Sequence, residues 1–130
     1  MTTVLRGATT INFNNKSEMQ NAVLEMYDNI IAKNNLSTKD IVFIIFACTK
    51  DLTCGNPATF LRINRTEVSE IPLLSLAHHE YTGALKKCIR VMLMTSQQID
   101  KPIHVYLNKA KKLREDLNDK YSNWRSKRSR

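Results

Sequence analysis

Residues 82–94 read TGALKKCIRVMLM and contain the most informative pattern in the chain. Gly83 is followed by an almost continuous apolar run over 88–94, which predicts a strand that is buried on both faces. Arg90 lies in the middle of that run. Because an unpaired buried charge costs several kcal/mol or more, Arg90 must either pair with a buried carboxylate or face a cavity that accepts an anion. The residues alone leave both alternatives open.

The apolar pattern also predicts the elements around this segment. A capping box of Ser17 and Gln20 would start one amphipathic helix, which Asn34 and Asn35 would end. Pro57 would begin a short second helix. The expected strands are a short one at 4–6, a central one at 40–48 that is covered on both sides, and two more at 71–76 and 103–107. The expected fold is therefore α/β, a mixed sheet with a helix over one face.

Two of these strands would bring polar side chains to a ligand. The strand at 4–6 is expected to end before Gly7 and to present Arg6 at its terminus. Over 103–107, period-two alternation places His104 and Tyr106 on one face and apolar residues on the other. Both features predict the wall of a pocket.

Length and composition fit one domain, because 130 residues with 42% hydrophobic content can form one compact core. No apolar run approaches the roughly 18 residues of a membrane span, and the first residues lack a signal-peptide layout, so a cytoplasmic location is expected. Cys48, Cys54 and Cys88 have no metal-ligand spacing and read as free thiols, and the three histidines give no zinc pattern. With three glycines there is no phosphate-binding loop, so no nucleotide cofactor is expected.

The net charge of +8 is concentrated at the C-terminal end. Residues 109–130 hold nine Lys and Arg against three Asp and Glu, which is six of the eight net charges. Together with Tyr121 and Trp124 this segment could bind RNA or an anionic surface, but such tails are more often solvated, and no RNA-binding motif accompanies it. We expect a folded domain over 1–117, a basic and disordered tail over 118–130, and no nucleic-acid partner.

Several fragments together resemble one family. They occur in the order and spacing of the small monofunctional chorismate mutases of the AroH type: LRGATT at 5–10, ACTKDL at 47–52, Pro57-Ala58 with Arg62, Ile71-Pro72, Thr82-Gly83, LKKCIRV at 85–91 and HVYL at 104–107. The resemblance covers roughly residues 3–117. It implies the rearrangement of chorismate to prephenate without a cofactor. It also implies a pseudo-α/β barrel formed as a homotrimer, with each active site between two subunits.

The resemblance further implies roles for individual residues. The substrate carries two carboxylates, and Arg binds a carboxylate with two parallel hydrogen bonds while staying charged. The arginine that matches Arg90 donates to the ether oxygen, which gains negative charge as the C–O bond breaks. Arg6 and Tyr106 match residues that bind a carboxylate, and Arg62 matches one near the mouth of the site. The full set of expected substrate-binding residues is Arg6, Arg62, Leu74, Ser75, Tyr106 and Arg114.

One departure from the family affects the chemistry directly. His78 stands where the family usually has a Glu that accepts a hydrogen bond from the ring hydroxyl. A neutral imidazole offers one acceptor nitrogen and no negative charge to complement Arg90. His78 is therefore either a re-tuned catalytic contact or a position that has lost its role. In the first case activity should rise with pH through about 6.5. Other substitutions gather at the ring-binding side, namely Asn56, Thr59, Leu74 and Ser75 in place of the family's aromatic, Lys, Thr and Cys.

Three functions follow from these observations. The leading one is a mutase that acts on chorismate or a close relative such as isochorismate or an amino-substituted chorismate. The alternative is a catalytically impaired homologue that binds a dicarboxylate or has a regulatory role. The third is a nucleic-acid binder that acts through the basic tail.

Overall fold

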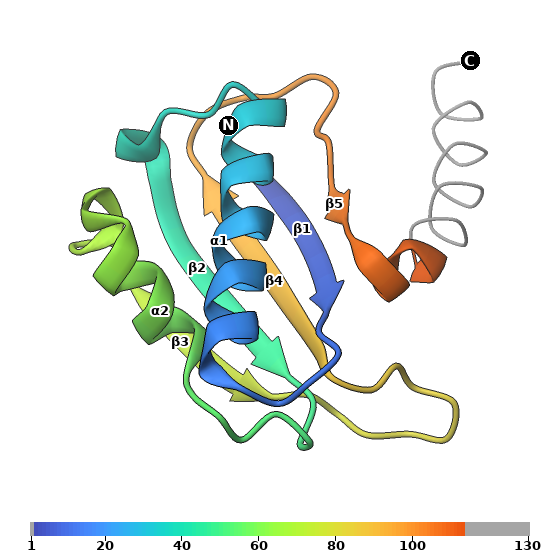
Figure 1. Cartoon of the computed structure of the whole chain (residues 1–130). Helices are drawn as coiled ribbons and strands as arrows, with labels where there is room; N and C mark the ends of the chain where they lie inside the picture. Colours follow the sequence, from blue (N-terminus) through green and yellow to red (C-terminus); the bar gives the residue numbers. More distant parts are fainter. Residues whose placement is uncertain (1, 114–130) are drawn as a thin grey trace, which may run out of the picture.

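The computed structural model of the chain describes residues 2–113, which form a five-stranded sheet with two helices on one face (Figure 1). The elements in chain order are β1 (Thr3–Thr10), α1 (Lys16–Lys33), η1 (Thr38–Asp40), β2 (Ile41–Cys48), α2 (Pro57–Asn64), η2 (Thr66–Val68), β3 (Leu73–Ala77), β4 (Cys88–Thr95), β5 (Val105–Tyr106) and η3 (Asn108–Ala110), where η marks a single 3₁₀ turn. The strand order is β3-β2-β4-β1-β5. β4 is antiparallel to both of its neighbours, whereas the β2–β3 and β1–β5 pairs are parallel. This mixed sheet confirms the predicted α/β class.

Helix α1 begins two residues earlier than the predicted capping box requires. The Asn15 side chain accepts a hydrogen bond from the Glu18 backbone N–H at 2.8 Å, and the Glu18 carboxylate accepts one from the Asn12 N–H at 3.2 Å. The first bond satisfies a first-turn N–H that has no partner inside the helix, and the second attaches the chain before the helix to its first turn. The prediction that Ser17 and Gln20 form the cap is therefore wrong, because Asn15 already serves as the N-cap.

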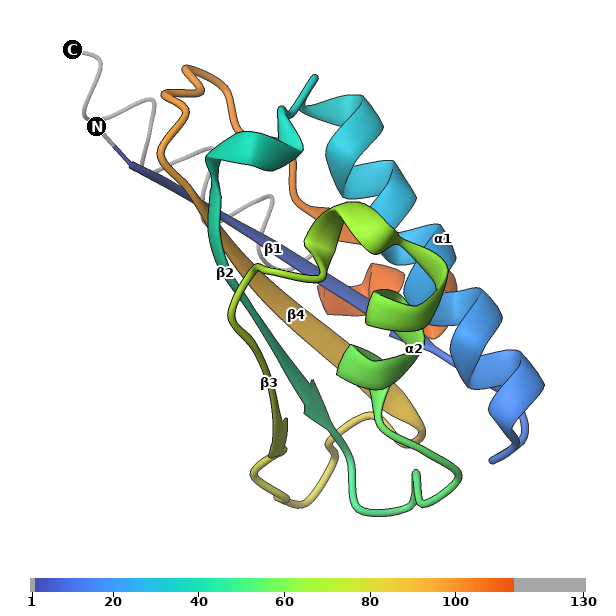
Figure 2. The ribbon, with the colours of Figure 1, turned by 90° about the vertical axis from the view of Figure 1, so that its left-hand side faces the viewer.

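The core lies between the sheet and the two helices, which cover the same face (Figure 2). Alternate residues of the strands point into it, as the period of two requires. The main contributors are Leu5, Ile44, Phe46, Ile89, Val91 and Leu93 from the sheet, Met19, Val23, Met26 and Ile30 from α1, and Leu61 from α2. The helix over one face of a sheet is thus confirmed.

The opposite face of the sheet is largely open in the single chain. The strands at 40–48 and 88–94 were expected to be buried on both faces, and this prediction is wrong for the chain by itself. On this face Met92 is 41% exposed and Phe43 and Ile45 are partly exposed, while Ile44 and Leu93 on the other face are buried. The physical reason is that an apolar run excludes a polar face but does not say what covers each face. We call this surface of the sheet the open face.

β1 is also longer than expected. It continues through Gly7 to Thr10, so Arg6 lies inside the strand and not at its terminus. Gly7 is required by close packing: a Cβ there would lie 3.0 Å from Val91 Cγ1 and 3.2 Å from Ile30 Cδ1. The glycine therefore lets α1 approach the sheet, and it does not end the strand as the sequence indicated.

No helix within residues 2–113 is long and apolar enough to cross a membrane. The same residues contain no group of three metal-binding side chains placed to hold an ion. Cys48, Cys54 and Cys88 are free thiols, as predicted.

Candidate active site

Arg90 lies at the centre of a row of side chains that crosses the open face. In the register of the sheet it stands opposite Ala8 on one side and Ala47 on the other. Ala8 in turn pairs with Tyr106, and Ala47 pairs with Leu76. Directly paired residues project from the same face of a sheet, so all five side chains share the open face. The two flanking alanines leave space around the guanidinium.

A cavity of about 320 Å³ occupies that space. Arg6, Arg90 and Tyr106 bring its polar groups, and apolar residues of β1, β2, β3 and β4 complete its wall. Arg6 belongs to the next row of the open face, where it pairs with Met92. Two cations and a phenol around one small apolar cavity form a site that fits a compact anion.

Arg90 has no internal counter-ion among the described residues. The ion pairs within 2–113 join Lys50 to Glu80 and Arg65 to Asp28, and neither includes Arg90. Its Nε atom is buried and has no hydrogen-bond partner. Of the two alternatives that burial left open, the structure favours the cavity over the buried carboxylate.

The thiol near Arg90 does not supply the missing negative charge. Burial raises the pKa of Cys88, and the opposing effect of the Arg90 guanidinium does not reverse this shift. Cys88 is therefore a neutral thiol at neutral pH. Burial likewise raises the pKa of Cys48 to about 12. Reactive cysteines need a depressed pKa, so neither of these groups is a nucleophile.

His78 follows β3 and is fixed by its backbone, whose N–H donates to the Cys48 carbonyl at 2.8 Å. Burial lowers the pKa of His78, and the positive charge of Arg90 lowers it further. The imidazole is therefore neutral at neutral pH. Its Nδ1 atom is buried without a hydrogen-bond partner. Within residues 2–113, His78 Nδ1 and Arg90 Nε are the buried side-chain polar atoms that lack a partner, a condition that costs about 1–3 kcal/mol per group and is typical of functional sites.

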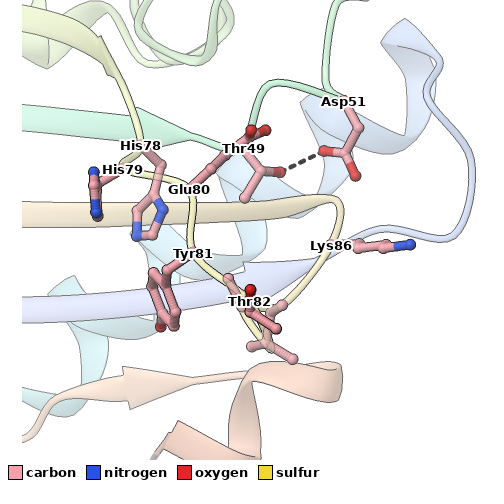
Figure 3. Close-up of a pocket in the computed structure, with 10 residues that line it drawn as sticks. Thr49, Asp51, His78, His79, Glu80, Tyr81, Thr82 and Lys86 are labelled. Carbon is pink, nitrogen blue, oxygen red and sulfur yellow. Dashed lines mark hydrogen bonds between the residues drawn. The ribbon is translucent and has the colours of Figure 1, made fainter.

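His78 also lines a second cavity, of about 560 Å³, under the loop that leads from β3 to β4. Figure 3 shows this loop cavity, with His78, Tyr81 and Thr82 on the loop and Thr49 and Asp51 on the segment that follows β2. His78 does not line the Arg90 cavity of the single chain, but it lies close enough to Arg90 for that positive charge to lower its pKa.

Tyr106 lies on β5 at the edge of the site. Burial raises the pKa of its phenol, while the charges of Arg6 and Arg90 act in the opposite direction. The phenol therefore stays protonated and can donate a hydrogen bond to an anion. His104, which was predicted to form the pocket wall together with Tyr106, does not line the cavity. Its Nδ1 instead accepts a hydrogen bond from the Arg6 backbone N–H at 3.0 Å, a contact with the strand that presents Arg6 which sequence reasoning missed and no local pattern indicates.

The remaining predicted contacts lie apart from the Arg90 cavity. Arg62 is on α2 and is exposed. Leu74 is on the open face but in β3, at the far edge of the sheet from Tyr106. The Ser75 hydroxyl points to the helix side, where it donates to Asn56 Oδ1 at 2.6 Å. Arg114, the boundary at 117 and the tail lie outside the described residues.

Comparisons with known proteins agree with this geometry. The family model for chorismate mutase type I matches residues 2–117. The chorismate mutase AroH of Bacillus subtilis (strain 168) is 33% identical over 115 residues, which cover 87% of this chain and 90% of the relative. The chorismate mutase AroH of Thermus thermophilus is 32% identical over 116 residues, which cover 87% and 93%.

A solved structure gives the same result for the fold. The chorismate mutase from Clostridium thermocellum superposes with a TM-score of 0.78 and 37% sequence identity, over 83% of this chain and 96% of the other. The match includes the fragments that surround Arg6, Arg90 and Tyr106, because the family model extends over almost all described residues. The chain therefore belongs to the type I chorismate mutase family.

Proposed function

We propose that this protein is a chorismate mutase that converts chorismate to prephenate at the Arg90 cavity. The observation that carries the proposal is an arginine on the open face whose buried Nε has no partner, and whose charge no carboxylate neutralises, among residues 2–113. The reaction is an intramolecular rearrangement, so the protein needs to bind the substrate, hold its reactive conformer and stabilise developing charge. Neither a nucleophile nor a metal is required.

The residues of the cavity divide this work. Arg6 and Tyr106 would bind a carboxylate from β1 and β5. Arg90 would donate to the ether oxygen, where charge develops as the C–O bond breaks, and one such donor is worth about 10²–10³ in rate. Holding the two reacting carbons together supplies a further entropic contribution. His78 Nδ1 would accept the hydrogen bond of the ring hydroxyl.

We further propose that the working enzyme is a homotrimer with its active sites between subunits. Two features of the single chain support this. The open face exposes apolar side chains that a monomer would leave in water, among them Val4, Leu74, Leu76 and Met92. In addition, Arg62 and Ser75 do not reach the Arg90 cavity of their own chain. A neighbouring copy would bring these residues, with Leu74 and Arg114, to the site and exclude water from it.

Free thiols at Cys48, Cys54 and Cys88 also favour a reducing compartment, and we place the enzyme in the cytoplasm. Its partners under this proposal are the dicarboxylate substrate and two further copies of the chain.

A dicarboxylate-binding protein without catalytic activity is the second candidate. It is favoured by one observation, the neutral His78 beside Arg90 in place of an acceptor that carries negative charge. Such a protein would keep the cationic cavity and lose the negatively charged acceptor for the hydrogen bond of the substrate's ring hydroxyl. The two candidates differ in turnover and not in binding.

The test is to follow the loss of chorismate absorbance and the appearance of prephenate with the wild-type protein and with His78→Glu. Turnover by the wild type supports the mutase. If His78→Glu is faster, the natural protein is a weakened or redirected enzyme. Binding of a dicarboxylate transition-state analogue without turnover would instead support the second candidate. Sedimentation of the same samples should give the mass of a trimer.

A further inference from the structure

The segment that follows β2 is tied to the beginning of β4 by a set of hydrogen bonds that the sequence did not reveal. The Cys88 N–H donates to Thr49 Oγ1 at 3.0 Å, and the Thr49 N–H donates to the Cys88 carbonyl at 3.1 Å. The Thr49 hydroxyl in turn donates to the carboxylate of Asp51, as the dashed line in Figure 3 marks. Both oxygens of that carboxylate accept from the Lys87 N–H, at 2.9 and 3.2 Å.

These bonds hold a backbone conformation that a side chain disfavours. Lys87 has a φ of 46°, in the left-handed region that favours glycine. Its N–H is held by Asp51, and its carbonyl accepts from the Ile11 N–H at 3.0 Å. The conformation of Lys87 sets the direction in which β4 starts, and Arg90 lies three residues further along that strand.

The other end of the loop is anchored to the same place. The His78 N–H donates to the carbonyl of Cys48, the last residue of β2. Both ends of the loop over 78–87 are therefore attached to residues 48–51. His78 lies at one end of the loop, and Arg90 lies just beyond the other end. The position of residues 48–51 therefore determines the distance and orientation between the side chains of His78 and Arg90.

We propose that Asp51 and Thr49 are positioning residues for the reaction. They hold the side chains of His78 and Arg90 at the positions from which both can contact the substrate. The inference rests on the proposed function of the Arg90 cavity. Neither side chain would touch the substrate, because the carboxylate and the hydroxyl are both engaged by the backbone and by each other. This assigns a function to the TKD stretch at 49–51.

The protonation state of Asp51 suits such a role. Burial acts to raise the pKa of its carboxyl, but the hydrogen bonds from Thr49 and from the Lys87 backbone outweigh this effect and leave the pKa below 3.8. The carboxylate therefore stays a full acceptor at neutral pH. The Lys87 side chain adds a favourable charge.

Steady-state kinetics of four variants test the proposal, at a temperature at which circular dichroism shows each to be folded. Asp51→Ala and Thr49→Val remove the bonds, and each should lower kcat by about 10- to 100-fold, the range expected for misplacing a reacting group by up to about 1 Å. Asp51→Asn keeps one acceptor oxygen and should fall between Asp51→Ala and the wild type. Thr49→Ser keeps the hydroxyl and should retain most of the activity.

The change should appear mainly in kcat, because Arg6 and Tyr106 bind the substrate from β1 and β5, which Asp51 does not contact. Glu80→Gln is the matched control: it removes a carboxylate from the same loop whose partner is the exposed Lys50 at 3.9 Å. It should leave kcat and KM as in the wild type. Equal losses in Glu80→Gln and Asp51→Ala, or full activity in Asp51→Ala, would overturn the proposal.

A second measurement separates positioning from a general loss of structure. If Asp51 acts by holding Arg90 and His78 relative to each other, then adding Asp51→Ala to Arg90→Ala should cost much less activity than Asp51→Ala costs in the wild type, because one of the two positioned groups is already absent. The same loss in both backgrounds would assign Asp51 to another task.

Hydrogen exchange gives a readout that does not depend on turnover. The amide protons of Lys87 and Cys88 should exchange faster in Asp51→Ala and Thr49→Val, while those of the β1–β4 ladder stay protected. If the wild type proves inactive with chorismate, the proposed function fails, and the same variants can still be compared for binding of a dicarboxylate transition-state analogue. Unchanged exchange and unchanged analogue binding would then reject the positioning role by itself.

Discussion

The two faces of the sheet differ in almost every physical property, although they are built from alternate residues of the same strands. In β4, Ile89, Val91 and Leu93 point to the helices and are buried in the apolar core. Arg90 and Met92 point to the open face, where the Arg90 Nε has no partner in the described part of the chain and Met92 is 41% exposed. One strand of eight residues thus contributes to both the stability and the proposed chemistry. The helix-covered face is buried within the single chain, whereas the open face is left partly exposed.

Two arginines differ in the same way, one with its charge paired inside the chain and one without such a pair among the described residues. Arg65, at the end of α2, donates from Nε and from Nη2 to both oxygens of Asp28 on α1. Its charge is satisfied inside the chain and joins the two helices. Arg90 has no such partner among residues 2–113, and its charge is directed at a cavity. The difference indicates which arginine is available to a ligand.

The largest expected effect is the difference in activity between a variant of Arg90 and a variant of Arg65. Arg90→Ala should lower kcat/KM by about 10³-fold, since it removes a preorganised charged donor from the reacting oxygen. Arg65→Ala removes only a partly exposed ion pair, so it should change the free energy of unfolding by about 1 kcal/mol or less and leave activity unchanged. Kinetics and urea denaturation of both variants measure these effects. A comparable loss of activity in the two would remove the distinction.

A core substitution should produce the next largest effect, this time on stability. Phe46 is 1% exposed on the helix-covered face, and Phe46→Ala should lower the free energy of unfolding by about 3–5 kcal/mol through lost burial and a residual cavity. Phe13 is 69% exposed, so Phe13→Ala should change it by no more than about 0.5 kcal/mol. Urea denaturation compares the two variants. Similar midpoints would mean that the helix-covered face is not the main source of stability.

Sequence patterns gave the helix-covered face well and the open face poorly. Period and capping signals indicate which residues a chain buries within itself, so α1, α2 from Pro57, β2 and β4 were predicted close to their observed bounds, whereas β1 was predicted too short. The apolar run around Arg90 did not indicate which residues pack against the open face of that strand. Packing on the open face depends on what lies outside the single chain.

The site shows a similar limit. Resemblance to the family identified Arg6, Arg90 and Tyr106, which the structure brings together in one cavity. The hydrogen bonds from Asp51 to the Lys87 backbone join positions 36 residues apart, and no local pattern predicts such a contact. By contrast, alternation in β3 could have shown that Ser75 faces the helices, since Leu74 on the strand beside it is exposed on the open face.

Adding a charge to the open face tests whether a second copy covers it. Val4 lies on β1 opposite Met94, is 37% exposed and does not line the Arg90 cavity. If a second copy covers this surface, Val4→Asp would bury an unpaired charge in the contact and weaken assembly. Sedimentation should then show a smaller species than the wild type, and activity per chain should fall at least about tenfold, the loss that 1.4 kcal/mol produces. Val4→Thr keeps the shape without the charge and serves as control. An active, unchanged assembly in Val4→Asp would show that this part of the face is free.

Protonation of His78 should give the smallest of these effects and the most specific one. Because burial and the charge of Arg90 lower its pKa, the folded protein keeps the imidazole neutral at pH values where an unfolded chain, with a pKa of 6.5, already binds a proton. Between the folded pKa and 6.5 the unfolded state therefore binds more protons, and stability should rise with pH across that window and level off above it. Activity should follow the neutral form, rising at most tenfold per pH unit through a value below 6.5 and not through 6.5 itself.

Rates and urea midpoints from pH 4.5 to 8, each compared with His78→Gln, measure this dependence. The amide of Gln can still accept a hydrogen bond but does not titrate, so the variant should lose the rise attributed to His78 in both quantities. A rise that persists in His78→Gln would belong to another group. A wild-type inflection above 6.5 would mean that a negative charge faces the imidazole, which is the opposite of the environment that Arg90 and burial create on the open face.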